Sequence, residues 1–127
     1  MKKKCIAIII AAAIACLACV PAFAGNSSFT LSPSVGNTVR TGPVQKDDYE
    51  SGVVNLKTGL LLDYVTFRIR TSDGDQATDY VDAAYYQKYY LAYYSGYNNA
   101  GDDYRLYSSY DSGQWRNGTT VTGIWAP

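Results

Sequence analysis

A strict alternation of apolar and polar side chains runs through the middle of this 127-residue chain. Val65, Phe67 and Ile69 occupy every second position of the segment from Leu62 to Arg70. Because successive side chains of a β-strand point to opposite faces, this pattern predicts a strand with one buried face. A shift of one residue would bury two arginines, so the hydrophobic pattern specifies the register of this strand strongly.

Shorter runs predict further strands nearer the N-terminus. Phe29 and Leu31 alternate with hydroxyl side chains until Pro33 ends the segment, and residues 38–41 form a second candidate strand. The polar, charged residues 45–52 are predicted to form a loop. Next, Val53, Val54 and Leu56 precede Lys57-Thr58-Gly59 and an apolar run that begins at Leu60, which predicts a hairpin.

The segment from Asp79 to Tyr94 is ambiguous. Residues 79–86 fit a helix, a loop or a strand, and we expect a loop or one helical turn there, followed by a strand from Gln87 to Tyr94. The next eight residues are rich in Gly, Asn, Ser and Asp. They lead to a second alternating run, Tyr104 to Tyr110, so the two runs are predicted to form a hairpin.

The C-terminal residues predict one more hairpin. Asn117-Gly118 is a preferred two-residue turn, and it would join residues 113–116 to residues 119–125. The last segment, Gly123 to Pro127, is predicted to complete a sheet, with a buried Trp125 and with Pro127 ending the strand. Altogether about seven short strands at 8 to 12 residue spacing favour an all-β fold, either a small antiparallel β-sandwich or a small barrel, and we predict the sandwich.

The first 24 residues have the layout of a cleaved signal peptide. Three lysines precede an apolar run from Cys5 to Val20, and Ala22-Phe23-Ala24 ends with a small residue suited to cleavage. The sequence therefore predicts a signal peptide at 1–24 and one domain at 25–127, secreted from a bacterium and extracellular or cell-wall associated. An uncleaved anchor and a lipidated cysteine are the alternatives.

Removal of this leader changes the composition. The remaining 103 residues carry 8 basic and 11 acidic side chains, and they contain no Cys, His or Met. This composition excludes disulfides, thiol nucleophiles, histidine bases and the usual zinc, haem and iron–sulfur ligands. With a formal charge of −3 and no basic run, we expect neither nucleic acid nor stable membrane insertion after cleavage. No cofactor is expected, and the domain is predicted not to be an enzyme.

Tyrosines are the most unusual feature of the predicted domain, which holds all 13 in the chain. In a strand each Tyr-Tyr pair directs one ring inward and one outward, so the rings serve either the core and sheet edges or an exposed binding platform. The candidate aromatic face consists of Tyr86, Tyr90, Tyr94, Tyr97, Arg68 and Arg70. The two arginines are expected to stack on tyrosines of a neighbouring strand, or to bind a sugar acid or a teichoic phosphate.

Acidic residues provide a weaker candidate site. Asp73, Asp75 and Asp79 carry oxygen ligands of the kind that calcium prefers, but Ala77 and Thr78 break the EF-hand spacing. Solvated turn carboxylates are therefore the preferred interpretation of this segment, and no metal site is predicted.

Two short segments carry a resemblance to known proteins. Gly101 to Leu106 and Val121 to Pro127, which closes on Gly-x-Trp-x-Pro, resemble short secreted proteins of unknown function from Gram-positive bacteria. The leader, the size and the Tyr-rich, Cys-free body are more distantly similar to bacteriocins of the lactococcin 972 type. The His-rich, Trp-led beginning expected of those bacteriocins is absent here.

These observations predict a secreted, non-catalytic interaction module or cell-envelope-associated module with a Tyr-rich surface. A bacteriocin-like toxin and a carbohydrate-binding domain are the alternatives. The partner would be a cell-surface glycan or a protein, and the sequence leaves the ligand and the oligomeric state open.

Overall fold

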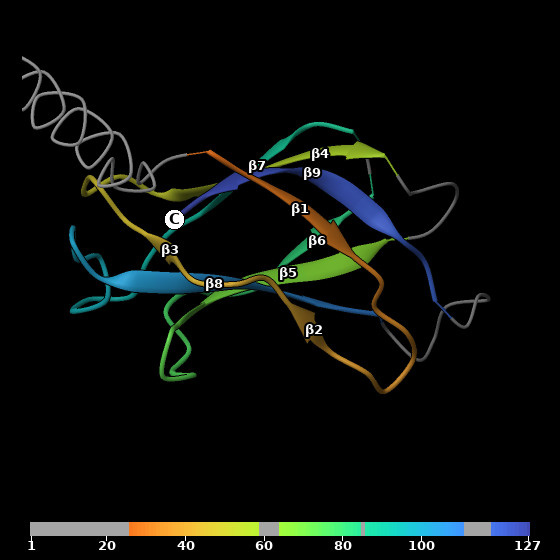
Figure 1. The fold of residues 1–127 in the computed structure, drawn as a ribbon, viewed down its shortest axis with the longest axis horizontal. Coiled ribbons are helices and arrows are strands. Elements are labelled where there is room, and N and C mark those ends of the chain that lie inside the picture. Colours follow the sequence, from red (N-terminus) through yellow and green to blue (C-terminus); the bar gives the residue numbers. More distant parts are fainter. Residues whose placement is uncertain (1–25, 59–63, 85, 111–117) are drawn as a thin grey trace, which may run out of the picture.

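The computed structural model describes residues 26–58, 64–84, 86–110 and 118–127, and these form a sandwich of antiparallel sheets (Figure 1). The strands are β1 (Ser27–Leu31), β2 (Val39–Arg40), β3 (Val44–Gln45), β4 (Gly52–Thr58), β5 (Val65–Thr71), β6 (Val81–Ala83), β7 (Lys88–Leu91), β8 (Asp103–Ser109) and β9 (Val121–Ala126). The predicted all-β sandwich is confirmed, with nine short strands in the described part of the chain instead of about seven. The predicted leader lies outside the described residues.

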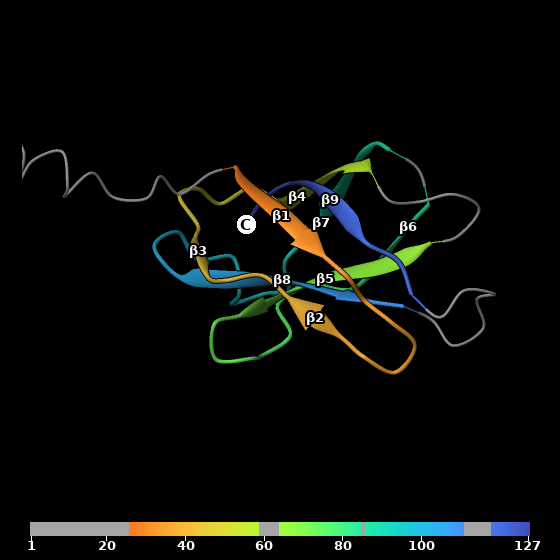
Figure 2. The same ribbon diagram turned by 45° about the vertical axis from the view of Figure 1, so that its right-hand side comes forward.

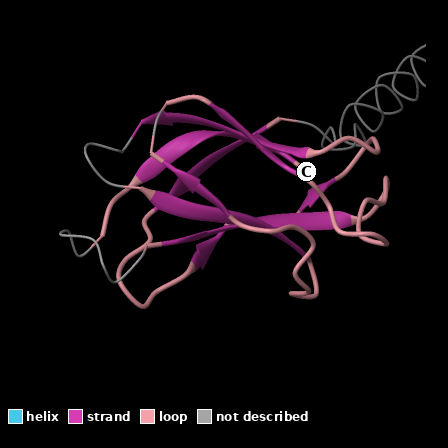
Figure 3. Ribbon diagram, turned by 180° about the vertical axis from the view of Figure 1, so that it is seen from behind, coloured by secondary structure: helices cyan, strands magenta, loops and turns pink. Residues whose placement is uncertain are grey.

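The strands are divided between two layers. The four-stranded sheet has the order β1-β9-β4-β7. The five-stranded sheet has the order β2-β8-β5-β6, and β3 pairs with β8 as well. The two layers stay separate when the molecule is turned by 45° (Figure 2), and strands and loops make up the described chain seen from behind (Figure 3).

The alternation in the middle of the chain has the predicted outcome. Val65, Phe67 and Ile69 of β5 are fully buried, while Thr66, Arg68 and Arg70 are half-buried and point away from the core. The turn that follows contains Gly74, whose φ of 98° lies in the left-handed region that glycine adopts without strain. Strand β5, which lies between β8 and β6, therefore packs its apolar side against the core.

The C-terminal strand also has the predicted role. Strand β9 lies between β1 and β4, so that Gly123 is opposite Phe29 on one side and Leu56 on the other. Trp125 is buried, and the strand ends just before Pro127. The predicted first strand is confirmed as well, since β1 ends at Leu31 before Pro33.

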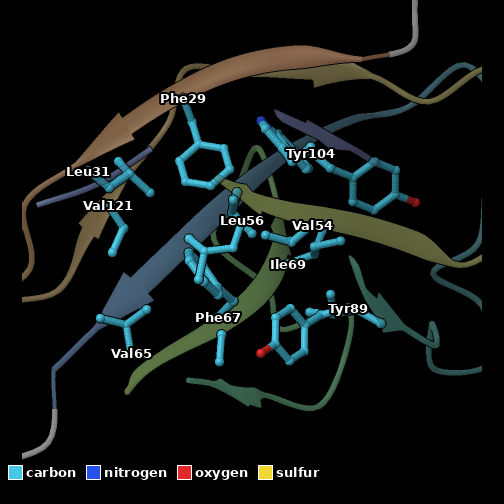
Figure 4. Close-up of a cluster of buried hydrophobic side chains, with 14 of the residues drawn as sticks. Phe29, Leu31, Val54, Leu56, Val65, Phe67, Ile69, Tyr89, Tyr104 and Val121 are labelled. Atoms are coloured by element: carbon cyan, nitrogen blue, oxygen red, sulfur yellow. The ribbon is translucent and has the colours of Figure 1, made fainter. Parts of the chain in front are cut away.

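The core fills the space between the two sheets (Figure 4). Most of its buried side chains come from β1, β4, β5, β7, β8 and β9, and they include Phe29, Leu31, Val54, Leu56, Val65, Phe67, Ile69, Tyr89, Leu91, Tyr104, Leu106, Val121 and Trp125. The rings of Phe29 and Phe67 meet edge to face, with centroids 5.8 Å apart, and so join the two sheets. Aromatic side chains thus link the layers of a domain that has no cysteine.

Two predicted hairpins are wrong. Strand β4 pairs with β7 and β9, whereas β5 pairs with β6 and β8, so the chain crosses between sheets after residue 58. Strands β7 and β8, which the sequence predicted to form a hairpin, also lie in different sheets. Turn residues serve a crossover between layers as readily as a hairpin, and only the packing of the sheets distinguishes the two.

Local predictions fail at two further segments. Residues 79–86, expected to be a loop or one helical turn, contain strand β6, because Val81 and Ala83 find partners on β5. Residues 45–52, expected to be a loop, begin in β3 and end in β4, and Lys46 between them is buried. The expected strand at residues 113–116 lies outside the described residues, and Gly118 bridges to Ser34.

Candidate binding faces

The tyrosine pairs show the expected alternation where both members are described. Tyr89 is buried with 8% of its surface exposed, whereas Tyr90 next to it is 67% exposed. Tyr93 packs against the core, and Tyr94 is more exposed. One ring of each pair therefore supports the core, and the other reaches the surface.

The structure does not bring the six predicted face residues together. Tyr90 of β7 lies on the outer side of the four-stranded sheet, away from the core. Arg68 and Arg70 lie on the outer side of the five-stranded sheet. These outer sides are opposite faces of the sandwich. Tyr97 is half-buried against the core, and Tyr86 is exposed just before β7.

Tyr94 belongs with the arginine side of the molecule. Its hydroxyl donates to Asp79 Oδ1 at 2.5 Å and accepts from Gln76 Nε2 at 3.2 Å. The main chain of Gln76 in turn pairs with that of Arg70 on β5. The hydrogen bond to Asp79 raises the pKa of Tyr94, because ionisation would place two negative charges side by side.

A hollow of about 360 Å³ opens on the outer side of the four-stranded sheet. We call it the Tyr90 hollow, and its lining residues are Asn26, Glu50, Val53, Asn55, Lys88, Tyr90, Ile124 and Ala126. The strand register creates it, because Val53 of β4 is opposite both Tyr90 of β7 and Ala126 of β9. Small and branched side chains line the hollow beside the exposed Tyr90 ring.

The polar groups of the Tyr90 hollow are mixed in kind. Asn55 is opposite Lys88 on one side and Ile124 on the other, and Glu50 closes the end next to β4. The hollow therefore combines an aromatic ring, apolar floor, amides, one cation and one carboxylate. In chemical terms, such a set of groups suits a ligand that has both apolar faces and hydroxyl groups.

Sequence reasoning identified Tyr90 but missed the floor of this hollow. Val53, Ile124 and Ala126 come from strands that are far apart in the sequence, and each looks like an ordinary strand residue. The only local signal was the alternation in β9, which places Ile124 and Ala126 on the side opposite Trp125.

The structure does not bring the three acidic candidates Asp73, Asp75 and Asp79 together. Asp73 and Asp75 line a second hollow of about 340 Å³ with Asp102 and Asp103, whereas Asp79 binds Tyr94 elsewhere. Within the described ranges, no group of three or more Asp, Glu, His or Cys side chains is arranged to hold a metal ion. In the same ranges, no helix has the length and apolar character needed to cross a membrane.

No known protein family and no curated protein matches the sequence.

Proposed function

We propose that the domain is a secreted, non-catalytic binding module that holds a neutral saccharide chain of the cell envelope in the Tyr90 hollow. The observation that carries the proposal is the exposed Tyr90 ring beside an apolar floor and a rim of amides. Export is supported by the layout of the first 24 residues.

A saccharide fits this chemistry better than an apolar or strongly charged ligand. The C–H face of a sugar ring stacks on a phenol ring, while sugar hydroxyls exchange hydrogen bonds with amides and carboxylates. Lys88 and Glu50 carry opposite charges, so the rim has no net charge to favour an anion or a cation. The set of groups matches a neutral, hydroxyl-rich chain.

Tyr90→Ala tests the proposal directly. Protein recovered from expression of the full chain is titrated with a panel of neutral oligosaccharides and is mixed with insoluble peptidoglycan. The variant should weaken saccharide binding at least about tenfold, since an exposed ring at the centre of a contact contributes at least about 1.4 kcal/mol. Tyr90→Phe keeps the ring and should keep most of the affinity.

Tyr80→Ala is the matched control, because Tyr80 is also highly exposed, at 62%, and does not line the Tyr90 hollow. It should bind as the parent does. Absence of binding to every saccharide and to peptidoglycan would overturn the proposal. Inhibition of related bacteria by protein that binds no glycan would favour the bacteriocin-like alternative instead.

A further inference from the structure

The outer side of the five-stranded sheet concentrates positive charge. We call it the arginine face, and it consists of Arg40 on β2, Arg68 and Arg70 on β5, and Arg105 and Tyr107 on β8. The register brings them together, because Tyr107 is opposite Arg40 on one side and Arg68 on the other. All four arginines in the described part of the chain lie on this face, although the predicted mature chain is acidic overall.

Two of the arginines are held in place by the main chain. Arg70 Nη1 donates to the carbonyl oxygen of Gly74 at 2.9 Å, and Arg105 Nη1 donates to that of Thr41 at 3.2 Å. Arg70 also lies 5.2 Å from the centre of the Tyr107 ring. These contacts orient the guanidinium groups without neutralising their charge.

Asp79 and Asp82 lie at the edge of this face, but each accepts a hydrogen bond from a hydroxyl group instead of pairing with an arginine. Arg70 is directly opposite Arg105 in the sheet, and like charges in that position repel each other. Within residues 26–58, 64–84, 86–110 and 118–127, no arginine is within 4.0 Å of a carboxylate, and the ion pair there joins Lys46 to Asp48. Asp82 on the neighbouring β6 accepts a hydrogen bond from Thr66 instead.

The surroundings of the arginines indicate which anion fits. Thr66 and Ser109 are opposite each other and add hydroxyl groups at one end of the face. At its edge Tyr94 presents a partly exposed ring, whose hydroxyl accepts a hydrogen bond from Gln76, the residue whose main chain pairs with Arg70. A pyranose ring with a carboxylate uses all three kinds of group, because guanidinium forks bind carboxylates, hydroxyls bind hydroxyls, and aromatic rings stack on sugars.

We propose that the arginine face binds an extended acidic polysaccharide, whose uronate carboxylates are held by the four arginines. An open sheet face suits a linear chain that lies across several strands. This site is independent of the Tyr90 hollow, because the two lie on opposite faces of the sandwich.

A hexamer of galacturonate is the probe, and its affinity for the parent protein is measured by calorimetry. Arg68→Gln should weaken galacturonate binding at least about fivefold. Arg40→Gln combined with Arg68→Gln should weaken galacturonate binding at least about tenfold more than it weakens the binding of a neutral hexamer. Neither arginine donates to the main chain among the described residues, so the sandwich should remain folded, as circular dichroism would verify. Raising NaCl from about 50 to about 500 mM should weaken the parent's binding.

Lys57→Gln is the matched control, since it removes one positive charge from the end of β4, away from the arginine face. Its affinity should stay within about twofold of the parent. Equal losses in Lys57→Gln and Arg68→Gln would overturn the proposal, because they would show a dependence on net charge alone. Equal or tighter binding of polyphosphate or of a single-stranded oligonucleotide would also overturn the assignment to a uronate polymer. Tyr90→Ala should leave galacturonate binding unchanged, which separates this test from that of the Tyr90 hollow.

Discussion

Lys46 shows how a single residue can escape prediction from sequence. Its side chain is buried, with 1% of the residue exposed, although it lies in a polar, charged stretch that suggests a solvated loop. The ammonium group donates to Asp48 Oδ1 at 3.1 Å and to the main-chain oxygens of Glu50 at 2.6 Å and Pro127 at 3.2 Å. It also lies 4.6 Å from the centre of the Tyr93 ring. One of these partners, Pro127, is 81 residues away in the chain, so only the fold reveals the role of Lys46.

Lys46→Met should lower the free energy of unfolding by about 2 to 4 kcal/mol. The substitution keeps the length of the side chain but removes the donor to the main-chain oxygens of Glu50 and Pro127, and the contact with Pro127 is buried. Urea unfolding followed by tryptophan fluorescence measures the change. Lys57→Met, at an exposed position, should change stability by less than about 0.5 kcal/mol. A loss in Lys46→Met no larger than this control would contradict the assigned role.

At the scale of the elements, the outcome depended on how strongly each segment was patterned. Strand β5 was predicted because three buried side chains alternate with polar ones. Strand β6 was missed because three residues carry too little pattern, and its pairing with β5 supplies the stabilisation. The pairing partners of β4 and β7 were not predictable from the sequence, since the residues that follow each strand suit a hairpin turn and a crossover between sheets equally well.

Gly123 lies at a tight contact between strands. Strand β9 has neighbours on both sides, and a Cβ atom at position 123 would overlap the main-chain oxygen of Asn55 and approach the Phe29 ring to 3.0 Å. Gly123→Ala should therefore destabilise the domain by about 3 kcal/mol or more, because neither backbone can move freely inside the sheet.

Thermal unfolding measures this effect, and Gly42→Ala is its control. Gly42 has open space around its Cβ position and no left-handed φ, so its replacement should shift the melting temperature little. A melting temperature of Gly123→Ala close to that of the parent would show that the β1–β9–β4 contact is looser than the structure indicates.

For the whole molecule, Asp48 and Tyr93 make stability depend on pH. The amide of Glu50 and then the Lys46 ammonium hold the pKa of Asp48 below its ordinary value of 3.8. This contribution is present above about pH 4 and is lost as the pH falls through the lowered pKa. Burial, reinforced by Tyr104, raises the pKa of Tyr93 above its ordinary value of 10.0. That contribution is complete below pH 10 and declines as the pH rises toward the raised pKa.

Tyr93→Phe should make stability less sensitive to alkaline pH. The Tyr93 hydroxyl is buried and has no hydrogen-bond partner among the described residues, so its removal should be neutral or stabilising by up to about 1 kcal/mol at pH 7. Above pH 10 the parent should lose up to about 1.4 kcal/mol per pH unit from this group, and the variant should not. Urea unfolding between neutral and alkaline pH measures both effects. An unchanged alkaline slope would contradict the assignment, and Tyr49→Phe, which alters a solvent-exposed ring, is the control.

Sequence by itself determined the class of fold and the inward or outward direction of many side chains. Period-two patterns in β1, β5, β8 and β9 are local, and burial of one face of a strand enforces them. It also identified Tyr90, Arg68 and Arg70 as surface groups of interest.

Tertiary structure decided which of these surface groups share a face. The assignment of each strand to a sheet depends on contacts between residues far apart in the chain, such as Ser27 with Trp125. The turn residues do not specify those contacts, so the Tyr90 hollow and the arginine face form only when the two sheets pack together. The burial of Lys46 has the same cause, because its partners meet only in the assembled sandwich.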